Sequence, residues 1–176
     1  SLGNPNIEPP DEFKKELVNL AGEHIPLKHG YAPNAGFTQT RQAIAEKINK
    51  THGLKLNADH VIMSCGAAGA LNVIFKSLLD PEDEVIVPTP YFLEYPFYVD
   101  NYRGVVKFAK TNADFSLDIK AIVAAISYKT KAILINSPNN PTGKVYSQQN
   151  IDGLAQLLTE KGKELNKTIY LISDEP

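Results

Sequence analysis

Apolar residues recur along the chain in two alternating patterns, which together predict a repeated order of strands and helices. Short continuous apolar runs, such as Ala132 to Ile135 and Ile169 to Ile172, are typical of strands that are buried on both faces. Between such runs, apolar residues three and four positions apart predict helices, most cleanly from Ala67 to Leu79. This alternation predicts a three-layer α/β/α fold, in which helices cover both faces of a mostly parallel sheet.

Capping and helix-breaking residues set the boundaries of the predicted elements. Pro10 precedes a first helix over 11–22, and Gly53 follows a second helix over 38–49. A short strand is expected over 60–63. The remaining predicted elements are strands over 84–87, 105–109, 132–136 and 168–174 and helices over 93–101, 118–126 and 148–164, the last of which is capped by Ser147.

Composition and charge narrow the class of protein. With 176 residues, of which 43% are apolar and 22% charged, the chain has the composition of an ordinary globular domain. A net charge of -2 provides no basic field for nucleic acid or an anionic membrane, and no apolar run approaches the roughly 20 residues of a membrane-spanning helix. The single cysteine, Cys65, is expected to be a buried small residue, and its isolation favours a reducing, cytoplasmic location.

Polar groups follow two of the predicted strands. The segment from Asn136 to Gly143 follows one strand, and Ser173-Asp174-Glu175 follows the next. In open α/β sheets the ligand crevice lies at the carboxyl ends of the strands, so an amide and an acid can converge there on one small molecule. Either motif alone would be read as a turn or a helix cap. Their order on consecutive strands favours a binding site.

Two further segments carry candidate chemistry. Cys65-Gly66-Ala67-Ala68-Gly69 lies between a predicted strand and a helix start, where free backbone N–H groups attract anions and small side chains allow close approach. Such turns are also commonly Gly/Ala-rich for packing alone. Phe92 follows another strand end and could stack on a planar ligand or simply pack under a loop.

These segments, in this order, resemble the fold-type I, class I/II aminotransferases, which are similar to aspartate aminotransferase and use pyridoxal 5'-phosphate (PLP). The resemblance implies the large domain of that fold and a role for each segment. Asn140 would bind the ring phenolate oxygen and the substrate, Asp174 the ring nitrogen, and Phe92 the ring face. The backbone amides of Ala67 and Ala68 would bind the phosphate, where many relatives add a side-chain donor at the position of Ala68.

The resemblance also extends to the amino-terminal part of the chain. The segment from His29 to Gly36 resembles the family's Tyr-x-x-x-x-Gly segment, which implies that Tyr31 reaches the cofactor phosphate of a partner subunit in a homodimer. Gly3 lies in a segment similar to the loop over the substrate carboxylate. We therefore expect a substrate-loop segment over 1–10 and the first part of the PLP-binding large domain over 11–176.

The family's Schiff-base lysine and carboxylate-binding arginine have no match in this chain, and the resemblance places both beyond Pro176. We expect the chain to be the amino-terminal portion of a longer protein and to be unable to transaminate by itself. The implied reaction moves an amino group between an amino acid and a 2-oxo acid. The resemblance does not identify which amino acid is the donor.

Alternatives within and outside enzymes stay open. A PLP-dependent C–S β-lyase or cyclase shares the same motifs, and so does an aminotransferase-like ligand-binding domain of a transcriptional regulator. A nicotinamide-dependent dehydrogenase is disfavoured because Gly66 to Gly69 lacks the G-x-G-x-x-G pattern. The four histidines show no metal-ligand spacing.

Overall fold

The computed structural model describes residues 7–175. The chain divides into two compact units, Ser1–Met63 and Ser64–Pro176, and each is described by itself. In the described part, no helix combines the length and the apolar character that crossing a membrane requires.

Within residues 7–63, the first unit contains three helical elements: α1 (Asp11–Gly22), α2 (Thr38–His52) and the short 3₁₀ helix η1 (Ala58–His60). Helix α2 ends at Gly53, whose positive φ of 67° is the left-handed conformation that suits glycine. From α2, the Arg41 guanidinium donates hydrogen bonds to the carbonyls of Gly36 (3.1 Å) and Ala58 (2.6 Å), which ties the loops of this unit together.

The strand expected over 60–63 is wrong. His60 ends η1, and a capping box with Asn57 fixes this short helix. Residues 61–63 follow outside any strand and have no ladder partner among the described residues, although the backbone of Val61 is extended. The Met63 N–H donates instead to the Ala35 carbonyl at 3.0 Å. An apolar run of this length cannot tell a strand from an extended loop.

The second unit follows the predicted alternation. In chain order its elements are α3 (Gly66–Leu78), β1 (Glu84–Thr89), α4 (Tyr95–Asp100), β2 (Val105–Lys110), α5 (Ile119–Ala125), β3 (Thr130–Asn136), α6 (Gln148–Glu164) and β4 (Tyr170–Asp174). Each lies within a few residues of its predicted range. The predicted cap of α6 is confirmed, because the Ser147 hydroxyl accepts from the Asn150 N–H, and Asp118 caps α5 by accepting from the N–H groups of Lys120 and Ala121.

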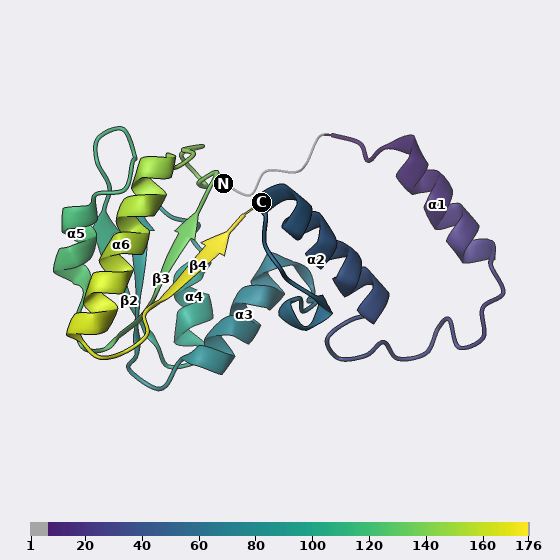
Figure 1. The fold of residues 1–176 in the computed structure, drawn as a ribbon, viewed down its shortest axis with the longest axis horizontal. Helices are drawn as coiled ribbons and strands as arrows, with labels where there is room; N and C mark the ends of the chain where they lie inside the picture. Colours follow the sequence, from purple (N-terminus) through teal and green to yellow (C-terminus); the bar gives the residue numbers. More distant parts are fainter. Residues whose placement is uncertain (1–6, 176) are drawn as a thin grey trace. The chain divides into compact units, whose positions relative to one another are not determined.

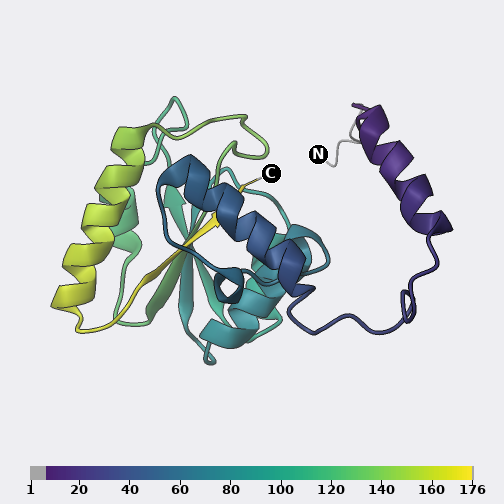
Figure 2. The same cartoon turned by 45° about the vertical axis from the view of Figure 1, so that its right-hand side comes forward.

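All four strands are parallel, and their order in the sheet is β2-β1-β3-β4. Two apolar clusters cover the two faces. Leu71 and Phe75 of α3 and Tyr95 of α4 pack on one face, while Ile122 of α5 and Leu154 of α6 pack on the other. Figures 1 and 2 show the strands lying between these helices, so the predicted three-layer α/β/α fold is confirmed.

The connections of the sheet define where a ligand crevice lies. From β1 the chain crosses by α4 to β2 on one side, then returns by α5 to β3 on the other side of β1. The direction of winding therefore reverses between β1 and β3. In open α/β sheets this topological switch point, at the carboxyl ends of the strands, is the usual ligand site.

Candidate functional site

The carboxyl ends of β3 and β4 lie side by side, as the sequence predicted. Asn136 and Asp174 are register partners on the two parallel strands. The Asn136 Nδ2 donates to the Asp174 carbonyl at 3.0 Å, and the Ser137 N–H donates to the same carbonyl at 3.2 Å. These bonds fix the backbone position of Asp174. They matter because β4 is the outer strand of the described sheet, and Ile172 is the only buried residue among its five.

The loop that carries Asn140 is held to two strand ends. The Asn140 N–H donates to Asn136 Oδ1 at 2.6 Å. Its neighbour Asn139 is 7% exposed, and its Nδ2 donates to the Pro90 carbonyl (3.1 Å) and to Thr142 Oγ1 (2.8 Å). Because Pro90 follows β1, this buried amide joins the loops on either side of the switch point. These bonds hold the Asn140 loop at the carboxyl end of β3, next to the loop that follows β1.

Tyr95 contacts both Phe92 and Asp174. The Tyr95 hydroxyl donates to Asp174 Oδ2 at 2.6 Å, and the Tyr95 ring packs edge-on against Phe92, with 5.6 Å between ring centroids. Tyr95 is 1% exposed. Burial, followed by the hydrogen bond to Asp174, raises the pKa of Tyr95 well above its ordinary value, so the hydroxyl remains a donor.

The placement of α3 follows from its length and its connection to β1. The 13 residues of α3 rise about 20 Å, close to the length of six-residue β1, and only residues 79–83 separate them. Because Leu71 and Phe75 pack in the cluster on the sheet, we infer that α3 runs back along β1 and begins toward the carboxyl ends of the strands. Ala67 and Ala68 are exposed there, and N-cap Cys65 makes no capping hydrogen bond.

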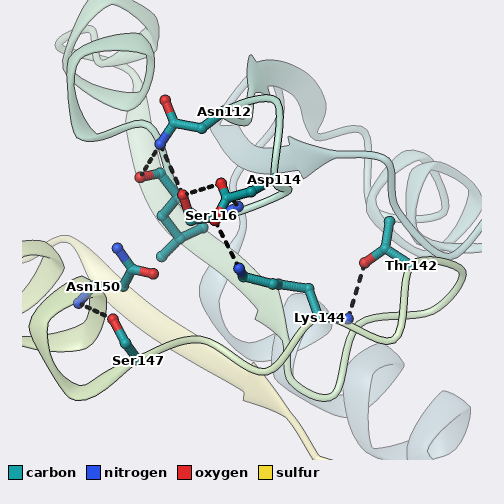
Figure 3. Close-up of polar contacts among 8 residues, drawn as sticks. Asn112, Asp114, Ser116, Thr142, Lys144, Ser147 and Asn150 are labelled. Carbon is teal, nitrogen blue, oxygen red and sulfur yellow. Dashed lines mark hydrogen bonds and ion pairs between the residues drawn. The ribbon is translucent and has the colours of Figure 1, made fainter.

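The outer side of the Asn140 loop is braced by the loop that follows β2. Figure 3 shows Lys144 pointing toward Asp114, with Nζ 2.9 Å from the carboxylate. The same carboxylate accepts from the Ser116 hydroxyl at 2.6 Å. Bonds from Ser116 and Lys144 hold the pKa of Asp114 well below its usual range. The pair therefore connects two loops of the carboxyl edge at its solvent-facing rim.

Two site predictions stay untested, and one expectation is wrong. Tyr31 lies in the first unit and is fully exposed, and its predicted contact with a partner subunit stays a prediction. Gly3 lies outside the described residues. Cys65, expected to be buried, is exposed, because it precedes the first turn of α3 rather than packing on the sheet. Among residues 7–175, no group of three or more potential metal ligands occurs.

Sequence reasoning missed the residues that hold the site together. Tyr95, Asn136 and Asn139 were assigned no functional role from the sequence. A signal existed for Tyr95, because a buried tyrosine hydroxyl needs a hydrogen-bond partner and Asp174 was a candidate acceptor. The links of Asn139 join β1 and β3 loops that lie far apart in the sequence, so only the fold reveals them.

The fold and this edge together define an open-sheet α/β protein with an acid, an amide and an aromatic ring gathered at its switch point. More specifically, the chain belongs to the aminotransferase class I and II family, whose profile matches residues 2–175. It is 37% identical, over 99% of its length, to the aspartate/prephenate aminotransferase of Thermus thermophilus and 35% identical, over 98%, to the aspartate aminotransferase of Bacillus subtilis.

Solved structures give the same assignment. An amino transferase from Eubacterium rectale superposes with a TM-score of 0.97 at 38% identity, over 100% of this chain and 45% of that protein. The Thermus thermophilus aspartate aminotransferase solved with maleate superposes with a TM-score of 0.84 at 37% identity, over 99% of this chain and 44% of that protein. The chain thus spans less than half the length of these relatives, and 44% and 42% of the Thermus and Bacillus enzymes.

Proposed function

We propose that the complete gene product is a PLP-dependent aminotransferase and that this chain supplies part of its cofactor site. The observation that carries the proposal is the convergence of Phe92, Asn140 and Asp174 at the switch point of the sheet. The hydrogen bonds of Asn136 and Asn139 join the loops that bear these residues. Family membership supports the same function.

The residues present fit the chemistry of PLP. A pyridinium N–H needs an acceptor, and Asp174 offers a carboxylate on a strand end. A phenolate oxygen needs a donor, and the Asn140 side-chain amide provides one. A phosphate needs several N–H donors with little steric hindrance, and the exposed first turn of α3 offers those of Ala67 and Ala68 beside Gly66, where an added Cβ would contact nothing within 4 Å.

When bound, PLP supplies the electron sink for the negative charge that remains after a substrate loses its α-proton. The residues of this chain would prepare the site for that step. Asp174 would accept from the ring nitrogen and keep it protonated, and Asn140 would donate to the ring oxygen. Phe92 would cover one ring face and exclude water from it.

The proposed substrates are an amino acid and a 2-oxo acid, and aspartate is the first donor to test. This choice is supported by the relatives from Thermus thermophilus and Bacillus subtilis, which are aspartate aminotransferases, and by the Thermus structure with the dicarboxylate maleate. We further propose a homodimer in which Tyr31 contacts the phosphate bound by the partner subunit. Its complete exposure supports a role in contact with a second chain.

The test is PLP titration of the complete gene product, followed by product analysis with aspartate and 2-oxoglutarate. We expect saturable PLP binding and equal amounts of the new amino acid and the new 2-oxo acid. In a parallel assay with a β-thioether amino acid, release of ammonia, pyruvate and the free thiol without amino-group transfer would favour a C–S β-lyase instead. A complete protein that binds no PLP would overturn the proposal. Replacing Tyr31 by Phe should weaken cofactor retention, since hydrogen bonds to charged groups contribute about 1.5–3 kcal/mol.

A further inference from the structure

The Asp174 carboxylate is held on one side only. Its Oδ2 accepts a hydrogen bond from the Tyr95 hydroxyl at 2.6 Å. Its Oδ1 accepts no hydrogen bond from any of the residues 7–175. The main-chain carbonyl of Asp174 is separately fixed by Asn136 and Ser137. With the backbone and one oxygen fixed, the second oxygen has a defined direction.

Tyr95 itself is firmly placed. It is the first residue of α4, and its backbone N–H donates to the Phe92 carbonyl at 3.1 Å. Its ring packs in the apolar cluster that contains Leu71, Val87 and Ile172. A hydroxyl on a ring held in this way has little freedom, so the geometry of its bond to Asp174 is set by the core of the protein rather than by the ligand.

The direction of proton donation is also fixed. Burial raises the pKa of Tyr95 far above its ordinary value, so the hydroxyl keeps its proton at neutral pH. Because the hydroxyl donates to Oδ2, Asp174 is the acceptor in this pair, and its Oδ1 can accept a second hydrogen bond from a ring N–H.

We propose that Tyr95 is a positioning residue for the cofactor ring: by holding Oδ2, it turns Oδ1 of Asp174 toward the ring nitrogen and keeps the shared proton on the ring. Tyr95 touches Asp174 and Phe92 and acts through them. The inference rests on the proposed function, because it assigns Asp174 to the ring nitrogen.

The test compares Tyr95→Phe with Tyr98→Phe in the complete protein loaded with PLP labelled with ¹⁵N in the ring. Tyr98 is a matched control, because it is also buried (8% exposed) in α4, but its hydroxyl donates to Glu94. Both variants keep the ring and lose only the hydroxyl. The ¹⁵N chemical shift reports the protonation of the ring nitrogen without requiring turnover.

We expect Tyr95→Phe to move the ring ¹⁵N resonance toward its unprotonated position and to lower kcat by about tenfold or more, with KM within about twofold. Tyr98→Phe should leave the resonance and both kinetic constants at their wild-type values. In an Asp174→Asn background, the effect of Tyr95→Phe should disappear, because the two residues act as one unit.

A Tyr95→Phe protein with the wild-type resonance and rate would overturn the role of Tyr95 while leaving the proposed function intact. An equal loss in the Asp174→Asn background would also overturn it, since that result indicates a purely structural contribution. A wild-type protein without bound PLP would instead refute the proposed function itself.

Discussion

Replacing Asp174 by Asn in the complete protein removes one negative charge with almost no change in side-chain volume. The structure indicates that the fold survives this substitution. The bonds from Asn136 and Ser137 go to the main-chain carbonyl of residue 174, and an Asn side chain can still accept from Tyr95. The bond from Tyr95 changes from charge-assisted to neutral, which costs about 1 kcal/mol of unfolding free energy.

The effect on the chemical step should be much larger. A preorganised electrostatic partner of developing charge typically contributes 10²- to 10³-fold to kcat, or about 2.7–4 kcal/mol. Asp174→Asn should therefore slow α-proton removal by about that factor and change KM little, because the charge matters after the substrate has bound. Single-turnover measurements with a deuterated donor isolate this step.

The control is Asp118→Asn. Asp118 caps α5 by accepting from the N–H groups of Lys120 and Ala121, and Asn caps helices about as well as Asp. This variant should keep the wild-type rate. An unchanged rate of proton removal in Asp174→Asn would refute the reasoning, because it would show that Asp174 acts as no more than a structural polar residue.

Three further outcomes are expected for the complete protein. Asn139→Ala should lower the unfolding free energy by about 1–3 kcal/mol, measured by urea denaturation, because the bonds to Pro90 and Thr142 are lost. Leu134→Ala should cost about 2–5 kcal/mol in the same assay, since Leu134 is completely buried. Burial and the bond to Glu94 raise the pKa of Tyr98 to about 12. The contribution of Tyr98 to the unfolding free energy is therefore fully present below about pH 10, the ordinary tyrosine pKa. It is lost as the pH rises from there toward 12, because the hydroxyl ionises first in the unfolded chain. Tyr98→Phe should flatten this decline, and an unaltered slope would contradict the assignment.

The sheet could be predicted from the sequence because its signals are local. Runs such as Ala132 to Ile135 are apolar at every position, which matches strands whose side chains alternate between two buried faces. Caps such as Asp118 and Ser147 are equally local, since each accepts from N–H groups two or three residues away. The extended stretch at 61–63 has a similar apolar composition without strand partners, so composition alone misassigned it.

The site was predicted in part for the same reason. Asn140 and Asp174 follow strand ends, and parallel strands bring such ends to one edge, so their convergence follows from topology. The packing that orients them was not predictable from local signals. Tyr95 and Asp174 are 79 positions apart in the sequence, and their contact depends on how α4 lies against the sheet. Burial of Asn139 likewise depends on loops that meet only in the folded chain.

The most direct test of the central claim is a crystal structure of the complete protein with PLP. We predict the cofactor at the carboxyl edge of the sheet, with Asp174 Oδ1 about 2.7–2.9 Å from the ring nitrogen, as in charge-assisted hydrogen bonds. Asn140 should donate to the ring oxygen, and the first turn of α3 should contact the phosphate. A cofactor bound at another surface, or with its ring nitrogen turned away from Asp174, would contradict the account.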